Sequence, residues 1–73
     1  MKGCNSIIKQ IDLALSQKTS EEVLTELAAN EEFLIRWCVA GNPNTPVEVL
    51  LKLVHDEDEL VRNAAKENLN MRE

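Results

Sequence analysis

A chain of 73 residues is long enough for one small domain with a thin hydrophobic core. Hydrophobic residues make up 44% of it and charged residues 29%, which is typical of a folded chain and excludes a disordered one. The net charge of −5 argues against nucleic acid and anionic membranes as partners, because both repel an acidic surface.

Residues 6–17 are predicted to form an amphipathic first helix. Its apolar side chains recur at helical spacing and form one stripe: Ile7, Ile8, Ile11, Ala14 and Leu15. The segment holds no unbroken apolar stretch of signal-peptide or membrane-span length, so we expect a cytoplasmic protein without membrane contact. We assign residues 1–18 as a capping helix for the repeats that follow.

Residues 19–44 and 45–70 are two copies of one pattern. Aligned at an offset of 26 positions, they share ten identical residues, which is far more than chance gives. Each copy predicts a pair of helices, and residues 71–73 are left as a tail. The expected helices are 20–29, 32–41, 46–55 and 59–69.

The turn between the two copies, "NPNTP", combines a helix stop with a helix start. Thr45 is expected to be the N-cap of a helix whose first residue is Pro46, and Glu48 completes a capping box. Thr19 is expected to play the same part in the first copy. Gly41 is expected to end the preceding helix in a left-handed conformation. The role of this turn is therefore geometric.

The apolar periodicity of the five helices also predicts the core. The expected core positions are Ile8, Ile11, Leu15, Leu24, Leu27, Leu34, Ile35, Cys38, Leu50, Leu53, Leu60, Val61, Ala64 and Ala65.

The second copy and the turn before it carry the pattern Ala-x-Asn-Pro-x-Thr-Pro, then Leu-x-x-Leu, an acidic pair, Val-Arg and Ala. The matching positions are Ala40, Asn42, Pro43, Thr45, Pro46, Leu50, Leu53, Asp56, Asp58, Val61, Arg62 and Ala65. This pattern resembles the leucine-rich repeat variant, a bacterial relative of HEAT and armadillo repeats. The resemblance covers residues 19–70 as one strong and one divergent unit.

This resemblance implies a fold and a general role. The fold is all-α: a short right-handed α-solenoid of two HEAT-like helix-pair repeats with an N-terminal capping helix, in a single domain over residues 1–73. The role is a scaffold for protein contacts. Some family members hold an iron–sulfur centre, but Cys4 and Cys38 supply at most two of the four thiolates normally required, so we expect no cofactor. Cys4 is expected to be exposed before the first helix, and Cys38 to be a small core residue.

The segment "HDEDE", from His55 to Glu59, concentrates one imidazole and four carboxylates. Such oxygens could bind calcium or magnesium, but the segment lacks the glycine and ligand spacing of a calcium loop. Helix capping explains the same residues, so no metal site is expected. His55 has no Ser or Cys partner in local register, and we expect no catalytic site and no enzyme.

Arg36 and Arg62 fall at equivalent positions of the two copies. HEAT-like repeats often use this arginine to reach an acid of a neighbouring repeat, and Asp56 or Asp58 is the expected acceptor for Arg36. Such pairs contribute about 0–1 kcal/mol each when exposed, so their expected role is register. Contact with a partner's carboxylate is the alternative.

Phe33 and Trp37 are the only aromatic residues, and their i, i+4 spacing puts them on one helix face. Their counterparts in the second copy, Glu59 and Asn63, are polar. The pair is expected either to be covered by the first helix or to contact another protein, since Trp and Arg are enriched in binding hot spots. The candidate protein-binding residues are Phe33, Arg36, Trp37 and Arg62.

The function expected from these patterns is a non-enzymatic protein–protein interaction module, a small bacterial cytoplasmic adaptor. The alternative is a nucleic-acid-associated HEAT-like protein that uses Lys and Arg on a concave face. Two repeats are fewer than such a stack usually needs, so a homodimer that buries Leu69 and Met71 is also expected.

Overall fold

The computed structural model describes the backbone of residues 2–72 and the side chains of residues 7–72. Within this part the regular structure is entirely helical, which confirms an all-α fold with five helices. The helices are α1 (Lys2–Leu15), α2 (Glu21–Leu27), α3 (Phe33–Gly41), α4 (Val47–Leu53) and α5 (Glu59–Met71). No helix between residues 2 and 72 has both the length and the apolar character needed to cross a bilayer.

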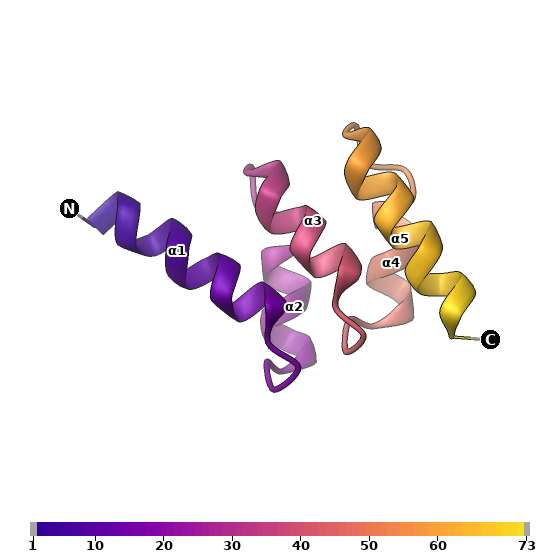
Figure 1. Cartoon of the computed structure of the whole chain (residues 1–73), viewed down its shortest axis with the longest axis horizontal. Helices are drawn as coiled ribbons and strands as arrows, with labels where there is room; N and C mark the ends of the chain where they lie inside the picture. The colour runs from indigo at the N-terminus through magenta and orange to yellow at the C-terminus, as the bar shows by residue number, and fades with distance from the viewer. Residues whose placement is uncertain (1, 73) are drawn as a thin grey trace.

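The helices form two layers. Figure 1 shows α1, α3 and α5 side by side at the front, with α2 and α4 behind them. The central helix α3 packs against α1 on one side and α5 on the other, while α4 packs mainly against α5. The molecule measures 41 × 26 × 14 Å, so it is only about two helices thick.

The core lies between the two layers. Its fully buried large side chains are Leu24, Ile35, Val39, Leu50 and Val61. Half of the fourteen predicted core residues are confirmed as buried: Leu24, Leu27, Ile35, Leu50, Leu53, Val61 and Ala65. Ile11, Cys38 and Ala64 are half-buried at its edge.

Four predicted core residues are instead exposed: Ile8, Leu15, Leu34 and Leu60. The reason is the phase of the helices rather than their period. In α3 the buried stripe runs through Ile35, Val39 and Ala40, which turns the neighbouring Leu34 outward. In α5 the stripe runs through Val61, and Leu60 faces outward in the same way. Among the α1 side chains that the structure describes, residues 7–15, only Ala14 is fully buried.

The two threonines of the repeat do not cap the helices that follow them. Ser20 and Pro46 are the N-cap residues of α2 and α4, so Pro46 precedes the first helical residue. The Thr19 and Thr45 side chains instead point back and donate to the carbonyls of Leu13 (2.6 Å) and Val39 (2.7 Å). Both threonines are buried, so each hydroxyl satisfies a carbonyl at the end of the preceding helix.

Gly41 does not adopt the predicted left-handed conformation, since no residue from 2 to 72 has a positive φ. It is the last residue of α3, and the helix ends because Asn42 is extended, with φ −81° and ψ 124°. This conformation is the one that a following proline favours. A Cβ at Gly41 would meet no atom within 4 Å, so packing does not require a glycine there either.

The buried asparagines link the front helices. The Asn42 side chain is 2% exposed, and its Nδ2 donates to the carbonyl oxygens of Ala14 and Ser16, both at 2.8 Å. Asn68 repeats this contact one copy later and donates to the carbonyls of Ala40 (2.9 Å) and Asn42 (3.0 Å). Each amide therefore satisfies two carbonyls at the end of the neighbouring helix, where the helix itself supplies no donor.

Replacing Asn42 with Ala is expected to lower the free energy of unfolding by at least about 2 kcal/mol, because the carbonyls of Ala14 and Ser16 lose the hydrogen bonds that the buried amide donates. Urea denaturation followed by circular dichroism measures the change. The control is Asn70→Ala, since Asn70 is exposed and its loss is expected to cost no more than about 0.5 kcal/mol. Equal stability of the two variants would contradict the role given to Asn42.

Candidate interaction surface

Arg36 is held inside the fold by four hydrogen bonds. Its Nε and Nη2 donate to the two carboxylate oxygens of Asp56 at 2.8 and 3.0 Å. Its Nη1 donates to the backbone oxygens of Asn30 (2.8 Å) and Glu31 (2.9 Å). The arginine side chain is 12% exposed and the aspartate side chain 9% exposed. The expected link to an acid of the next repeat is therefore present, and Asp56 is the acceptor.

The pair is stabilised in its ionised form. Burial alone would raise the pKa of Asp56, but the hydrogen bonds from Arg36 and from the Asp58 N–H, together with the arginine's charge, lower that pKa below its ordinary value. The hydrogen bond to Asp56 raises the pKa of Arg36 against the opposing effect of burial.

The same link recurs one copy earlier with neutral groups. Asn30 Nδ2 donates to Gln10 Oε1 at 3.3 Å, and Gln10 precedes Arg36 by the repeat length of 26 residues. Helix α1 thus holds the place that α3 and α5 hold in the two repeats. Arg62, the third member of this series, donates from Nη1 to the backbone oxygen of Asp56 at 2.7 Å and is half-buried.

The acidic segment before α5 supports the helix and the neighbouring repeat. Asp58 is the N-cap of α5, and its Oδ1 accepts hydrogen bonds from the N–H groups of Leu60 (2.8 Å) and Val61 (3.4 Å). Asp56 forms its ion pair with Arg36, while His55 and Glu57 are exposed. Among the side chains of residues 7–72, no three His, Cys, Asp or Glu groups gather closely enough to hold a metal ion.

The two cysteines lie in different settings. Cys38 is half-buried in α3, and burial raises the pKa of its thiol, which keeps the sulfur protonated and weakly nucleophilic. Cys4 lies within α1 rather than before it as predicted, because α1 begins at Lys2. Its side chain lies outside the described ones, so the expected exposure of Cys4 stays a prediction.

The two aromatic residues stay partly open to solvent. Phe33 is 37% exposed and Trp37 is 41% exposed, although α1 packs against the helix that carries them. Leu34, between them in sequence, is 39% exposed.

These side chains continue across the front layer. Residues 8, 34 and 60 are equivalent positions of the three front helices, and all three are exposed apolar residues. We use the name apolar strip for these three residues together with the exposed or half-buried apolar side chains next to them on α1 and α3. It consists of Ile7, Ile8, Ile11, Phe33, Leu34, Trp37 and Leu60.

Sequence reasoning found the aromatic part of the apolar strip but assigned Ile8, Leu34 and Leu60 to the core. The 26-residue spacing of these three apolar residues, extended back into the first helix, is the signal that could have found them. Two other exposed apolar residues, Val47 and Leu51 on α4, have polar counterparts in the first repeat and form no such row.

Two shallow hollows flank α3. One, of about 240 Å³, is lined by Leu15, Trp37, Cys38, Gly41, Asn42 and Pro43. The other, of about 230 Å³, is lined by Gly41, Pro43, Ala64, Glu67, Asn68 and Met71. Gly41 borders both hollows.

Replacing Asp56 with Asn is expected to lower stability at pH 7 by about 1–3 kcal/mol, because Arg36 loses a charged partner. The folded pKa of Asp56 is depressed, so its contribution is present above its unfolded pKa and is lost as pH falls through the lower folded value. The difference in the free energy of unfolding between wild type and Asp56→Asn should therefore become smaller as pH falls below about 4. Denaturation from pH 7 to pH 2 measures it, with the exposed Glu57→Gln as control. A difference independent of pH would contradict the ionised pair.

Comparison with known proteins gives one match. Residues 35–58 match the family model described as leucine rich repeat variant, a segment that runs from the buried stripe of α3 through α4 to the N-cap of α5. No curated protein and no solved structure matches the chain. The suspected family, the leucine rich repeat variant, is therefore confirmed for residues 35–58.

Proposed function

We propose that this chain is a non-enzymatic protein–protein interaction module, a small adaptor of the bacterial cytoplasm built as a short right-handed α-solenoid. The observation that carries the proposal is the apolar strip across α1, α3 and α5. The repeat match at residues 35–58 supports it, because helical repeats of this kind typically present extended binding surfaces.

The apolar strip has the properties of a binding surface. Its large side chains stand on helices whose backbone is already fixed by the core and the asparagine contacts, so little ordering is needed on binding. Trp37 stands on α3, the middle one of the three front helices, and tryptophan is among the residues that contribute most to protein–protein affinity. A group of exposed large apolar side chains on a small protein commonly marks an interaction site.

A protein fits this surface better than a nucleic acid does. Of the basic side chains described, Arg36 is bound to Asp56, and Arg72 donates to the carbonyl of Pro43 at 2.7 Å. The exposed lysines lie on separate elements and form no basic row within residues 7–72: Lys9, Lys18, Lys52 and Lys66. Binding to DNA or RNA that weakens steeply between about 50 and 200 mM salt would support the nucleic-acid alternative instead.

Replacing Trp37 with Ala is expected to weaken binding of the natural protein partner by at least 2 kcal/mol, a typical hot-spot loss. The partner is captured from source cells, identified by mass spectrometry and titrated by calorimetry. The matched control is Asn63→Ala at the equivalent position of α5, which should change affinity little. Unchanged affinity in Trp37→Ala, together with a large fall in melting temperature, would show that the aromatic pair belongs to the core and that the site lies elsewhere.

We also propose a homodimer formed through the end of α5, where Met71 is 82% exposed and Leu69 is half-buried. A twofold contact there would bury both side chains. Sedimentation equilibrium is expected to show dimers, and Met71→Ser is expected to shift the protein toward monomer. A fit to a single species of 8.2 kDa up to high micromolar concentration would contradict the dimer.

A further inference from the structure

Carboxylates border the apolar strip. A hollow at the acidic end of the front layer is lined by Glu31, Glu32, Phe33, Arg36, Glu57 and Asp58, so an exposed aromatic ring lies among acidic side chains. The arginine there is already paired with Asp56. We call the exposed glutamates at this end of the apolar strip the acidic rim: Glu31, Glu32, Glu57 and Glu59.

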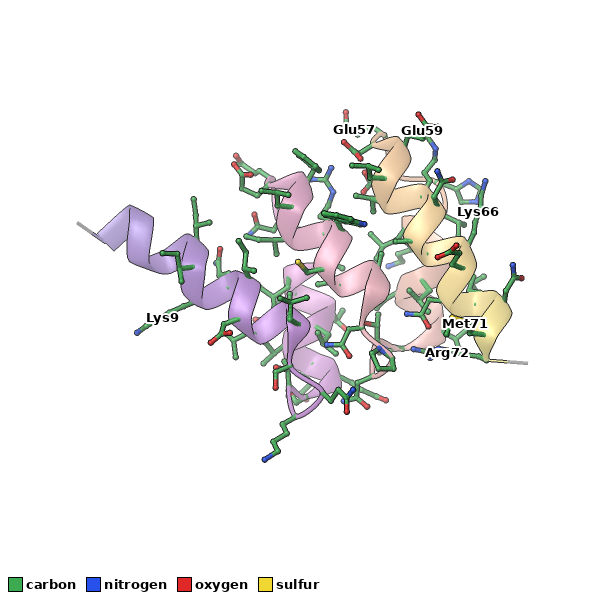
Figure 2. All side chains as sticks on the ribbon, viewed as in Figure 1. Lys9, Glu57, Glu59, Lys66, Met71 and Arg72 are labelled. Carbon is green, nitrogen blue, oxygen red and sulfur yellow. The ribbon has the colours of Figure 1, made fainter. Side chains whose placement is uncertain are left out.

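The nearest lysines do not neutralise the acidic rim. Figure 2 shows Glu57 and Glu59 together at the start of α5. In the same view, Lys66 extends from the side of α5 that faces away from α3, and Lys9 extends from α1 away from the other helices. A ligand on the apolar strip would therefore meet negative charge at this end, and a positively charged ligand is favoured.

The shape of the front layer favours a helix as the ligand. Residues 2–72 contain no strand, so the chain offers no sheet edge to which an extended peptide could add. The hollow lined by Leu15, Trp37 and Cys38 instead offers a place for a side chain that projects from one face of a helix.

A second copy of this chain is a poor occupant of the apolar strip. It would bring its own acidic rim against the same carboxylates. Like charges placed opposite one another oppose association. The end of α5, where we place the homodimer contact, is a different part of the surface.

From these observations we infer that the apolar strip binds a cationic amphipathic helix of another protein, with apolar side chains on the strip and Lys or Arg side chains against the acidic rim. This inference rests on the proposed function and adds the chemistry of the partner.

The test uses the full chain and two fluorescein-labelled helical peptides of 18 residues. Both peptides share one leucine face, and their polar positions are all Lys in one and all Glu in the other. Fluorescence anisotropy is expected to give at least about tenfold tighter binding of the Lys peptide, weakening as salt is raised. The double variant Glu31→Lys, Glu57→Lys is expected to lose at least about tenfold of this affinity.

The matched control is Glu22→Lys, Glu48→Lys on α2 and α4, in the rear layer. Each Glu→Lys change adds two charges, so either double variant shifts the net charge from −5 to −1. The control should change the affinity for the Lys peptide by less than about threefold, since its charges are distant from the strip. Circular dichroism checks that both variants keep their helix content.

Several outcomes would overturn the inference: equal affinities for the two peptides, binding of neither, equal losses in the two double variants, or Lys-peptide binding unchanged by Trp37→Ala. A homodimer dissociated by Trp37→Ala would place a second copy on the strip and overturn it as well. If any of these occurs while capture of the natural partner still depends on Trp37, the proposed function stands and only the cationic chemistry fails.

Discussion

The amide of Asn42 donates both of its hydrogens to the carbonyls of Ala14 and Ser16, and this contact fixes the position of α1 against α3. Two helices packed only through apolar side chains could slide or rotate against each other with little loss of packing energy. The amide removes this freedom because its two acceptors lie at the end of one particular helix. Asn68 repeats the contact between α3 and α5, so one residue type sets the spacing of the whole front layer.

Arg36 and Asp56 perform a similar task at the opposite end of the front helices. Their bidentate contact joins the start of α3 to the turn before α5, while the asparagines act at the helix ends. With both ends of α3 fixed, the direction in which each of its side chains points is also fixed. The outward position of Phe33, Leu34 and Trp37 is therefore a property of the fold and not of local flexibility.

The helices and the repeat could be predicted because both depend on local patterns. Apolar spacing gives the helices, and the 26-residue identity gives the second copy. The roles of Thr45 and Asn42 could not be predicted in this way. A threonine before a proline normally indicates a helix cap, whereas the Thr45 hydroxyl donates to a carbonyl of the preceding helix. The carbonyls that accept from the Asn42 amide lie 28 and 26 residues earlier, so no local pattern identifies them.

The sequence also did not predict which face of α3 is buried. Leu34 and Ile35 are adjacent and both apolar, so periodicity alone cannot say which one faces the core. Packing against the rear layer decides it. The candidate surface was accordingly predicted only where it departed from the repeat, at Phe33 and Trp37, while Leu34 and Leu60 were assigned to the interior.

The hydrogen bonds that the threonine and asparagine side chains donate also have a direction along the chain, since these donors lie later than their acceptors, whereas the contact from Arg36 to Asp56 runs the other way. Thr19 bonds a carbonyl six residues earlier, and Asn42 bonds carbonyls 28 and 26 residues earlier. On a ribosome, which releases the N-terminus first, α1 emerges well before the amide that satisfies its end. Each repeat is thus completed by the residues that follow it, and the nascent chain gains its fixed geometry one repeat behind its synthesis.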